Sequence, residues 1–347
     1  MIGEISGKIA IEEHVTFPDA TSYFFAAEER LSPDRVSRLG RVVDALADLG
    51  ERRVETMKAA RIDCSILSLI SPGVQIEPDL RKAADAAGRL NDQLAAAIDG
   101  RPAFAGFAHL ALQSPDDAAR ELERCITQLG FVGFMINGHS CGTYLDDPGF
   151  EPIWERATAL GAPLYLHPAH APQIPEVSTK PIEMAASLWG WMAETGGHAL
   201  RMMLNGVFDR HPDLQLVLGH MGEALPFLSW RMDSGVRRML PERRPGRMPS
   251  DYLLSNVHAT TSGVLSTPSL KCTLETMGAD RVLFATDYPL EDSIIASDWL
   301  DGAGLEADTY RAVARENALR LFPGLADRLG QSVPPFVGNR MGDNPAP

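Results

Sequence analysis

The chain has 347 residues, of which 45% are hydrophobic and 22% are charged. This balance is typical of a folded globular enzyme and excludes an intrinsically disordered chain. The formal net charge of −14, without a clustered basic face, argues against general binding of nucleic acid. No apolar run approaches the roughly 18 residues of a membrane span. The N-terminal residues also lack the charged and then apolar pattern of a signal sequence, so we expect neither a membrane anchor nor secretion.

The sequence contains four cysteines, Cys64, Cys125, Cys141 and Cys272. Their spacing matches neither a metal motif nor a redox motif. Cysteines of this kind suit a reducing compartment better than a disulfide framework, so we expect a cytoplasmic protein.

Eight short runs are predicted as β-strands, and a helical pattern follows each of them. The runs cover residues 8–14, 62–70, 104–112, 131–138, 163–168, 214–222, 257–263 and 282–288. Several are continuously apolar, such as CSILSLI at 64–70, as expected for strands covered on both faces. The regular alternation predicts parallel βαβ units. We therefore expect a (β/α)8 TIM barrel with long loops at its C-terminal face, where the chemistry of such barrels takes place.

The helical patterns have the spacing of amphipathic helices. Over 78–98, one stripe comprises Leu80, Ala84, Ala87, Leu90, Leu94 and Ile98. We expect this stripe to face the barrel wall. Further helices are predicted over 150–160, 223–240, 267–277 and 307–321.

Three regions exceed a minimal barrel. Residues 17–45 separate the first strand from its helix and include Phe24, which we expect near the barrel mouth. Residues 169–197 form a long insertion that is rich in proline and tryptophan. Long segments on this face usually shape substrate pockets. We assign residues 1–325 to the barrel and 326–347 to a C-terminal tail.

Five apolar runs stop at side chains that bind metals or transfer protons: IAIEEH, PLYLHP, LQLVLGHMGE, VHATTSG and VLFATDYP. Glu12 and His14 lie two apart on a strand, so both point to one face while Glu13 points away. His167 and Asp287 add a second nitrogen and a second oxygen. Two nitrogen and two oxygen donors, with room for water or substrate, predict an open catalytic site for one ion, either Zn²⁺ or Mn²⁺.

A single histidine at a strand end is more often a hydrogen-bonded structural residue than a ligand. The co-occurrence of candidates on several strands is what indicates a site. Structural roles are expected for His109, His198 and His211. The roles of three histidines near the expected mouth stay open at this point: His139, His170 and His258.

Two further charged residues have alternative interpretations. Glu223 either caps the helix that begins near Met221, because helix N-termini favour carboxylates, or orients His220. Arg231 either joins a surface ion pair or faces the site, since its helical position alone does not place it.

A resemblance to the amidohydrolase superfamily is carried by the runs GKIAIEEH, ILSLISPGVQ, LGFVGFMINGH, LYLHP, HALRMMLNGVFDRHPDLQLVLGHMGE, LSWRMD and RVLFATDYPLED. More narrowly, the chain resembles the aminocarboxymuconate-semialdehyde-decarboxylase-like branch, which includes γ-resorcylate and 2,3-dihydroxybenzoate decarboxylases. The resemblance extends from about residue 7 to residue 322. The E-x-H start is informative, because the hydrolytic majority of the superfamily begins with H-x-H.

The resemblance implies a site and a reaction. One divalent metal would be held by Glu12, His14, His167 and Asp287. His220 with Glu223 would handle protons, and Arg231 would engage the carboxylate of a small aromatic acid. Asp287 would protonate the ring of a hydroxylated or amino-substituted acid before CO2 leaves. Relatives of this group are typically homodimers or homotetramers.

The chain also departs from the family pattern. PAHAP follows the fifth strand, so Ala169 and His170 stand where the decarboxylases carry Arg and Asn, and Leu290 stands where a pocket Phe is common. We expect Phe24, His170 and Leu290 to contact the substrate. A second hypothesis is a metal-dependent hydrolase or hydratase in which the ion activates water and Asp287 takes its proton. A third is a barrel retained for binding or subunit assembly.

Overall fold

The computed structural model describes residues 7–31, 39–240, 242 and 245–334. Its eight strands are β1 Lys8–Val15, β2 Ile62–Leu69, β3 Phe104–His109, β4 Gly133–Asn137, β5 Leu164–His167, β6 Leu216–Leu218, β7 Val257–Thr260 and β8 Val282–Leu283. They pair in sequence order, and each neighbouring pair is parallel. The expected (β/α)8 barrel is confirmed.

The last strand returns to the first and closes the barrel. A parallel bridge joins Glu13 to Tyr288, and the backbone N–H of Asp287 donates to the carbonyl of Glu12 at 2.9 Å. The N–H of His14 donates to the carbonyl of Tyr288 at 2.7 Å. These bonds tie the segment that carries Asp287 to the strand that carries Glu12 and His14.

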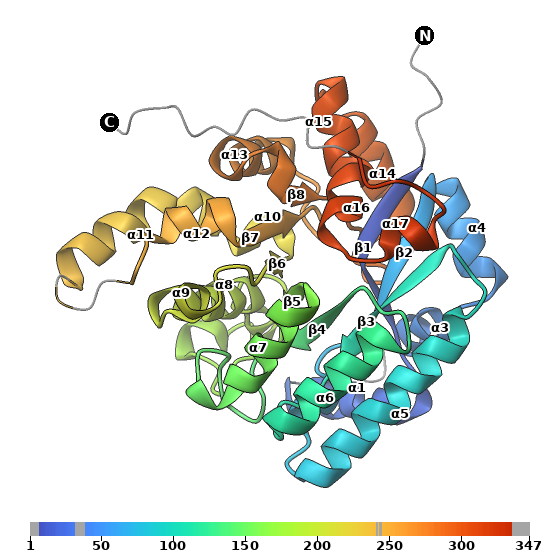
Figure 1. Ribbon diagram of the computed structural model, residues 1–347, viewed down its shortest axis with the longest axis horizontal. Helices are drawn as coiled ribbons and strands as arrows, with labels where there is room; N and C mark the ends of the chain where they lie inside the picture. The colour runs from blue at the N-terminus through green and yellow to red at the C-terminus, as the bar shows by residue number, and fades with distance from the viewer. Residues whose placement is uncertain (1–6, 32–38, 241, 243–244, 335–347) are drawn as a thin grey trace.

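Helices surround the strands, and α11 with α12 extends outward from one side of the barrel (Figure 1). Three helices follow β1: α1 Pro18–Leu31, α3 Gly40–Ala47 and α4 Glu51–Ala59. The next three strands are followed by α5 Leu80–Ile98, α6 Pro115–Thr127 and α7 Glu151–Leu160. The later ones are α8 Gly190–Leu204, α9 Val207–Arg210, α10 His220–Glu223, α11 Leu225–Met239, α12 Pro249–Ser255, α13 Thr267–Met277, α14 Ser293–Asp301, α15 Ala307–Arg311, a π-helical turn Ala312–Glu316, α16 Asn317–Leu321 and α17 Leu325–Arg328.

Two apolar layers hold the barrel together. Side chains on alternate strand positions, including Ile9, Ile11 and Phe107, fill its interior, and Phe322 with Leu325 closes one end. The other strand faces pack against the surrounding helices in a larger cluster. Because both faces are covered, the strands are continuously apolar, as their sequence indicated.

Several predicted boundaries were wrong. β6 ends at Leu218 and β8 at Leu283, several residues before the predicted ends. In both cases a tight turn or an irregular segment follows the strand and carries polar side chains. Residues 18–31, expected within a long connecting segment, form helix α1. The division into a barrel of residues 1–325 and a tail of 326–347 stays a prediction. It falls within α17, where Ala326 is buried, and residues 335–347 lie outside the described part of the chain.

The predicted apolar stripe of α5 is correct except at its start. Ala87, Leu90, Leu94 and Ile98 are buried, whereas Leu80 is 55% exposed. Leu80 is the first residue of the helix, directly after the N-cap Asp79, and it lies beyond the region where the helix packs against the barrel.

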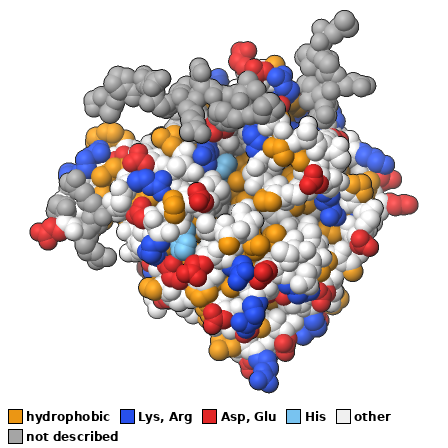
Figure 2. Space-filling view, viewed as in Figure 1, with side chains coloured by type: hydrophobic (Ala, Val, Ile, Leu, Met, Phe, Trp, Pro, Cys, Tyr) orange, Lys and Arg blue, Asp and Glu red, His pale blue; other side chains and the backbone are white. Residues whose placement is uncertain are grey.

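The surface agrees with the expectations from composition. Acidic and basic side chains are mixed across the face seen in Figure 2, with no broad area of basic charge. Over the described residues, no helix combines the length and the apolar character that crossing a bilayer requires.

The α5 correction leads to a matched test. Leu90→Ala should lower the free energy of unfolding by about 2–5 kcal/mol, because it removes buried apolar contacts and leaves a cavity. Leu80→Ala should change it by less than about 0.5 kcal/mol, as is usual for exposed positions. Urea unfolding of both variants measures the difference, and equal losses would contradict the packing described for α5.

Candidate active site

Four buried side chains converge at the C-terminal end of the barrel. Glu12 and His14 come from β1, His167 ends β5, and Asp287 follows β8. One ligand atom from each lies within 4.8 Å of all the others. Glu12 Oε1 is 3.3 Å from His167 Nε2, and His14 Nε2 is 3.2 Å from Asp287 Oδ1. The four residues form a candidate site for one divalent metal ion.

The unpaired atoms of this cluster support that assignment. Glu12 Oε1, His14 Nε2 and Asp287 Oδ1 are buried and have no hydrogen-bond partner. Buried polar atoms normally have one, because leaving them unpaired costs free energy. Ligands at about 2.1 Å from an ion in tetrahedral geometry are about 3.4 Å apart, which is close to the two distances above.

The outward-facing atoms of the same side chains are held by hydrogen bonds. His14 Nδ1 is 3.0 Å from Ser68 Oγ, and His167 Nδ1 donates to the carbonyl of Pro168 at 2.9 Å. The carbonyl can only accept, so the proton of His167 is on Nδ1 and its Nε2 is bare toward the cluster, which is the tautomer that a metal ligand requires. The Ser68 hydroxyl can accept from His14 Nδ1 in the same way, and His14 Nε2 also faces the cluster.

Glu12 is held in a similar way through its second oxygen. Tyr165 Oη donates a hydrogen bond to Oε2, and Thr260 Oγ1 donates to the same atom at 3.3 Å. Thr260 also lies 2.8 Å from Ser262 Oγ. The hydroxyl groups leave Oε1 free to face the cluster.

His220 approaches the cluster from a turn with unusual backbone geometry. His220, Met221, Glu223 and Ala224 all have positive φ angles, between 52° and 61°. Non-glycine residues in this region cost energy and are common at functional sites. Gly263 packs against the ring, since a Cβ atom there would lie 2.8 Å from His220 Cδ2.

The turn pairs His220 with Glu223. His220 Nδ1 is 2.8 Å from Glu223 Oε1, while Nε2 is 3.9 Å from Asp287 Oδ2. Helix α11 begins only at Leu225, with Ala224 as its N-cap, so Glu223 does not cap that helix. Its contact with His220 is compatible with the other interpretation, in which Glu223 orients the imidazole, and that role stays a prediction.

The charges of these groups influence one another. Burial alone would lower the pKa of His220, but the carboxylates of Glu223 and Glu12 outweigh it and hold this pKa well above its usual range. Burial also works to raise the pKa of Asp287, but interaction with His14 and His220 leaves it lowered. In the chain without a metal ion, these directions favour a protonated imidazole beside an ionised carboxylate.

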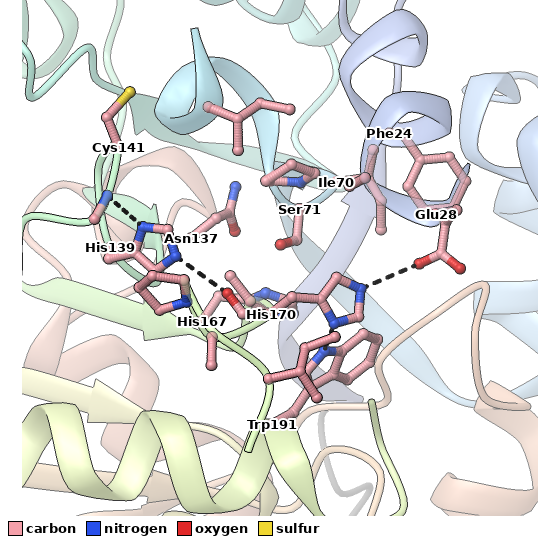
Figure 3. Close-up of a pocket in the computed structure, with 18 of the residues that line it drawn as sticks. Phe24, Glu28, Ile70, Ser71, Asn137, His139, Cys141, His167, His170 and Trp191 are labelled. Atoms are coloured by element: carbon pink, nitrogen blue, oxygen red, sulfur yellow. Dashed lines mark hydrogen bonds and ion pairs between the residues drawn. The ribbon is translucent and has the colours of Figure 1, made fainter. Parts of the chain in front are cut away.

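Two hollows open on either side of the cluster. One, of about 560 Å³, is lined by His167 and by the predicted substrate contacts Phe24, His170 and Leu290 (Figure 3). The other, of about 660 Å³, is lined by His220, Glu223 and Asp287. The indole of Trp191 lines both hollows and lies between them.

Arg231 does not reach the cluster within the chain. It is exposed on α11 and does not belong to the described residues that line either hollow. The structure of one chain therefore does not support the predicted contact between Arg231 and the substrate carboxylate.

The remaining histidines differ in their surroundings, and His211 is bonded to Glu151 at 2.6 Å, away from the cluster. His109 and His198 are buried and accept backbone hydrogen bonds from Val74 and Leu145, and burial lowers their pKa values to about 4 and about 3. His139 and His170 line the first hollow. His258, placed near the mouth from sequence, instead lies at the start of β7 and contacts Gln215, at the opposite end of the strand from the cluster.

Sequence reasoning did not assign roles to Tyr165 or Asn137. A signal for Tyr165 existed, because it lies two residues before His167 on the same strand and so shares its face. Asn137 carried no comparable signal in the sequence. It lies beside His167 because β4 pairs with β5 in this register, and the register is visible only in the structure.

Comparisons with known proteins agree with this geometry. The sequence model of the amidohydrolase family matches residues 65–324. The chain is 40% identical over 338 residues to a γ-resorcylate decarboxylase of Rhizobium sp. (strain MTP-10005), covering 92% of this chain and 98% of that protein.

Solved structures are similar over nearly the whole barrel. A crystal structure of 2,6-dihydroxybenzoate decarboxylase in complex with 2,6-dihydroxybenzoate matches with a TM-score of 0.84 and 39% identity, covering 91% of this chain and 99% of that one. A 5-carboxyvanillate decarboxylase from Novosphingobium aromaticivorans DSM 12444, with manganese and 4-hydroxy-3-methoxy-5-nitrobenzoic acid, matches with a TM-score of 0.85 and 36% identity, covering 92% and 97%.

The family model spans most of the chain, and these relatives cover almost all of it at substantial identity. The protein therefore belongs to the amidohydrolase family, in the group that contains the γ-resorcylate decarboxylases.

Proposed function

We propose that the protein is a metal-dependent, non-oxidative decarboxylase of a hydroxylated or amino-substituted aromatic acid. The observation that carries the proposal is the cluster of Glu12, His14, His167 and Asp287 with the His220–Glu223 pair beside it. Relatives that match over nearly their full length are named decarboxylases of such acids. We propose Mn²⁺ or Zn²⁺ as the ion, and manganese is present in the carboxyvanillate decarboxylase structure.

The bound ion would hold the carboxylate and the neighbouring phenolic oxygen of the substrate, and so fix the ring against the protein's acid. The protein supplies the proton. His220, protonated and anchored by Glu223 at Nδ1, directs its Nε2 proton toward Asp287 Oδ2, 3.9 Å away. This distance exceeds a hydrogen bond, so a small rotation or a bridging water completes the path.

We propose that Asp287 passes this proton to the ring. Its Oδ1 faces the metal cluster, and its Oδ2 faces His220 and the second hollow. Protonation of the ring carbon that bears the carboxylate comes first. The carbon–carbon bond then breaks, CO2 leaves, and the bonding electrons restore the aromatic ring. The net reaction consumes one proton and leaves hydrogen where the carboxylate was.

We also propose that the protein assembles as a homodimer or homotetramer. Helix α11 exposes large apolar side chains, with Phe227 80% and Trp230 73% exposed. An exposed apolar face of this kind is unusual on a monomer and typical of a subunit interface. Arg231 lies next to Trp230 on this helix, and its contact with the substrate stays a proposal.

The cysteines are free thiols, which supports the proposed cytoplasmic location.

The acid is tested by Asp287→Asn. CO2 release from 2,6-dihydroxybenzoate should fall at least about 100-fold, the usual contribution of a general acid, while the fold is kept. Solvent deuterium entering the product ring at the carboxylate position checks the protonation step in the unchanged protein. Asp213→Asn, at an exposed position, is the matched control. Substantial CO2 release by metal-loaded Asp287→Asn would refute the role, and turnover of amides, esters or lactones without CO2 would favour a hydrolase.

The hydroxyl groups around Glu12 lead to a second test. Tyr165→Phe should weaken metal binding about 10- to 100-fold, as is usual when a partner of a ligand is lost. Competition with a chelator measures the affinity. Tyr252→Phe is the control, because Tyr252 is also buried but donates to Asp209, away from the cluster. If both variants bind Mn²⁺ as the unchanged protein does, Tyr165 does not position Glu12.

The interface is tested by Trp230→Glu. Placing a charge on the exposed face of α11 should convert the oligomer into a smaller species, measured by light scattering coupled to size exclusion. Leu80→Glu changes an exposed apolar residue on α5 instead and should leave the mass unchanged. A monomeric starting protein, or no change in mass with Trp230→Glu, would contradict the proposal.

A further inference from the structure

Asn137 is a buried amide without a partner in the hollow beside His167. It is the last residue of β4 and is only 1% exposed. Neither its Oδ1 nor its Nδ2 has a hydrogen-bond partner. Figure 3 shows its side chain among Ser71, His139 and His167.

The neighbouring polar side chains of the hollow already have partners. His139 accepts from the N–H of Gly142 at Nδ1 (2.9 Å) and donates from Nε2 to the carbonyl of His170 (3.1 Å). Ser71 donates to the carbonyl of Pro168 at 3.0 Å. Among the described residues of this hollow, Asn137 alone has buried side-chain polar atoms that lack a partner.

Polar contacts hold one wall of the hollow that contains Asn137, and apolar side chains form the other. Trp191 Nε1 donates to His170 Nδ1 at 3.0 Å, and His170 Nε2 lies 3.7 Å from Glu28 Oε1, so the wall formed by Trp191 is fixed (Figure 3). Phe24 and Ile70 supply buried apolar surface opposite. A preformed slot of this kind costs little to order when a planar ring binds.

The place of Asn137 at the end of β4 brings it within reach of a ring held at the four candidate metal ligands. Its Cα pairs in register with that of His167 on the adjacent strand, and neighbouring strands are about 4.8 Å apart. A primary amide offers one acceptor and two donors, and it carries no charge. It therefore complements a hydroxyl or amino group, which both donates and accepts.

We propose that Asn137 is a specificity-determining residue that binds a second, neutral polar substituent on the ring of the aromatic acid. The inference rests on the proposed function, and it identifies what the hollow beside His167 recognises. A second carboxylate at this place is disfavoured, because the described lining contains the carboxylate of Glu28 and neither Lys nor Arg. Among these described lining residues, an anion would find no Lys or Arg to replace its lost hydration.

Unreactive ligands separate binding from turnover. The nitro compounds 2-nitroresorcinol and 3-nitrocatechol carry two hydroxyl groups, 2-nitrophenol carries one, and none of them has a carboxylate to lose. Calorimetry on the Mn²⁺-loaded protein gives their affinities. We expect at least one of the two dihydroxy compounds to bind about tenfold or more tightly than 2-nitrophenol, since sites built to bond a hydroxyl reject analogues that lack it.

Asn137→Leu should reduce that preference to less than about threefold, with the affinity for 2-nitrophenol little changed. Asn205→Leu makes the same chemical change at an exposed position whose amide donates to Asp146, and it should keep the preference. If Asn137→Leu fails to fold or to bind Mn²⁺, Asn137→Ser takes its place and should also reduce the preference, because its shorter side chain cannot make both bonds.

The outcomes distinguish the inference from the function on which it rests. An unchanged preference in the metal-loaded Asn137 variant, or no preference in the starting protein, overturns the role of Asn137 even if CO2 is released from aromatic acids. A preference that depends on Asn137, in a protein that releases no CO2 from any dihydroxybenzoate, supports the binding site and refutes the decarboxylase.

Discussion

Two buried carboxylates that face each other and two imidazoles are the constraint on which the site depends. Glu12 and Asp287 are withdrawn from water, and removing an ionised carboxylate from water costs several kcal/mol unless a cation compensates. His220, whose pKa the neighbouring carboxylates raise, lies at the edge of the group and compensates in part. A divalent ion would satisfy the remaining unpaired atoms at once. Barrel closure, the hydroxyl groups around Glu12 and the turn of His220 all serve to keep these atoms together.

The separation of the two hollows follows from the same arrangement. His167 and His220 lie on different sides of the cluster, one lining each hollow. The groups proposed to handle protons line one hollow, and the apolar slot with Asn137 lies in the other. Trp191 contributes to both, so the position of its indole affects how a ring lies relative to Asp287. In this arrangement the proposed proton donor and the proposed recognition of ring substituents occupy different parts of the mouth.

Much of this could be predicted from the sequence, for identifiable reasons. Glu12, His14, His167 and Asp287 follow apolar runs, and parallel strands bring such ends together in a barrel. The ends of β6 and β8 could not be predicted, because the apolar pattern continues into a left-handed turn after Leu218 and into an irregular segment after Leu283. Asn137 could not be identified from the sequence. Its proposed role rests on buried amide atoms that lack a hydrogen-bond partner, and only the packed structure shows this. His258 was expected near the barrel mouth but lies at the start of β7, because a short apolar run does not show how far a polar residue lies from the end of the strand. The role of Arg231 depends on what packs against α11, and the position of Arg231 on the helix gives no information about that.

The segment between β5 and α8 has a consequence for how this protein can change over time. It carries Ala169 and His170, and Trp191 lies just inside the helix that follows, whereas the four candidate metal ligands lie on or directly after three strands. Substitutions, insertions or deletions in this one stretch can reshape the slot without disturbing the atoms that perform the chemistry. Such a division lets a lineage explore new aromatic acids by altering a single contiguous piece of its gene, with the reaction itself inherited intact.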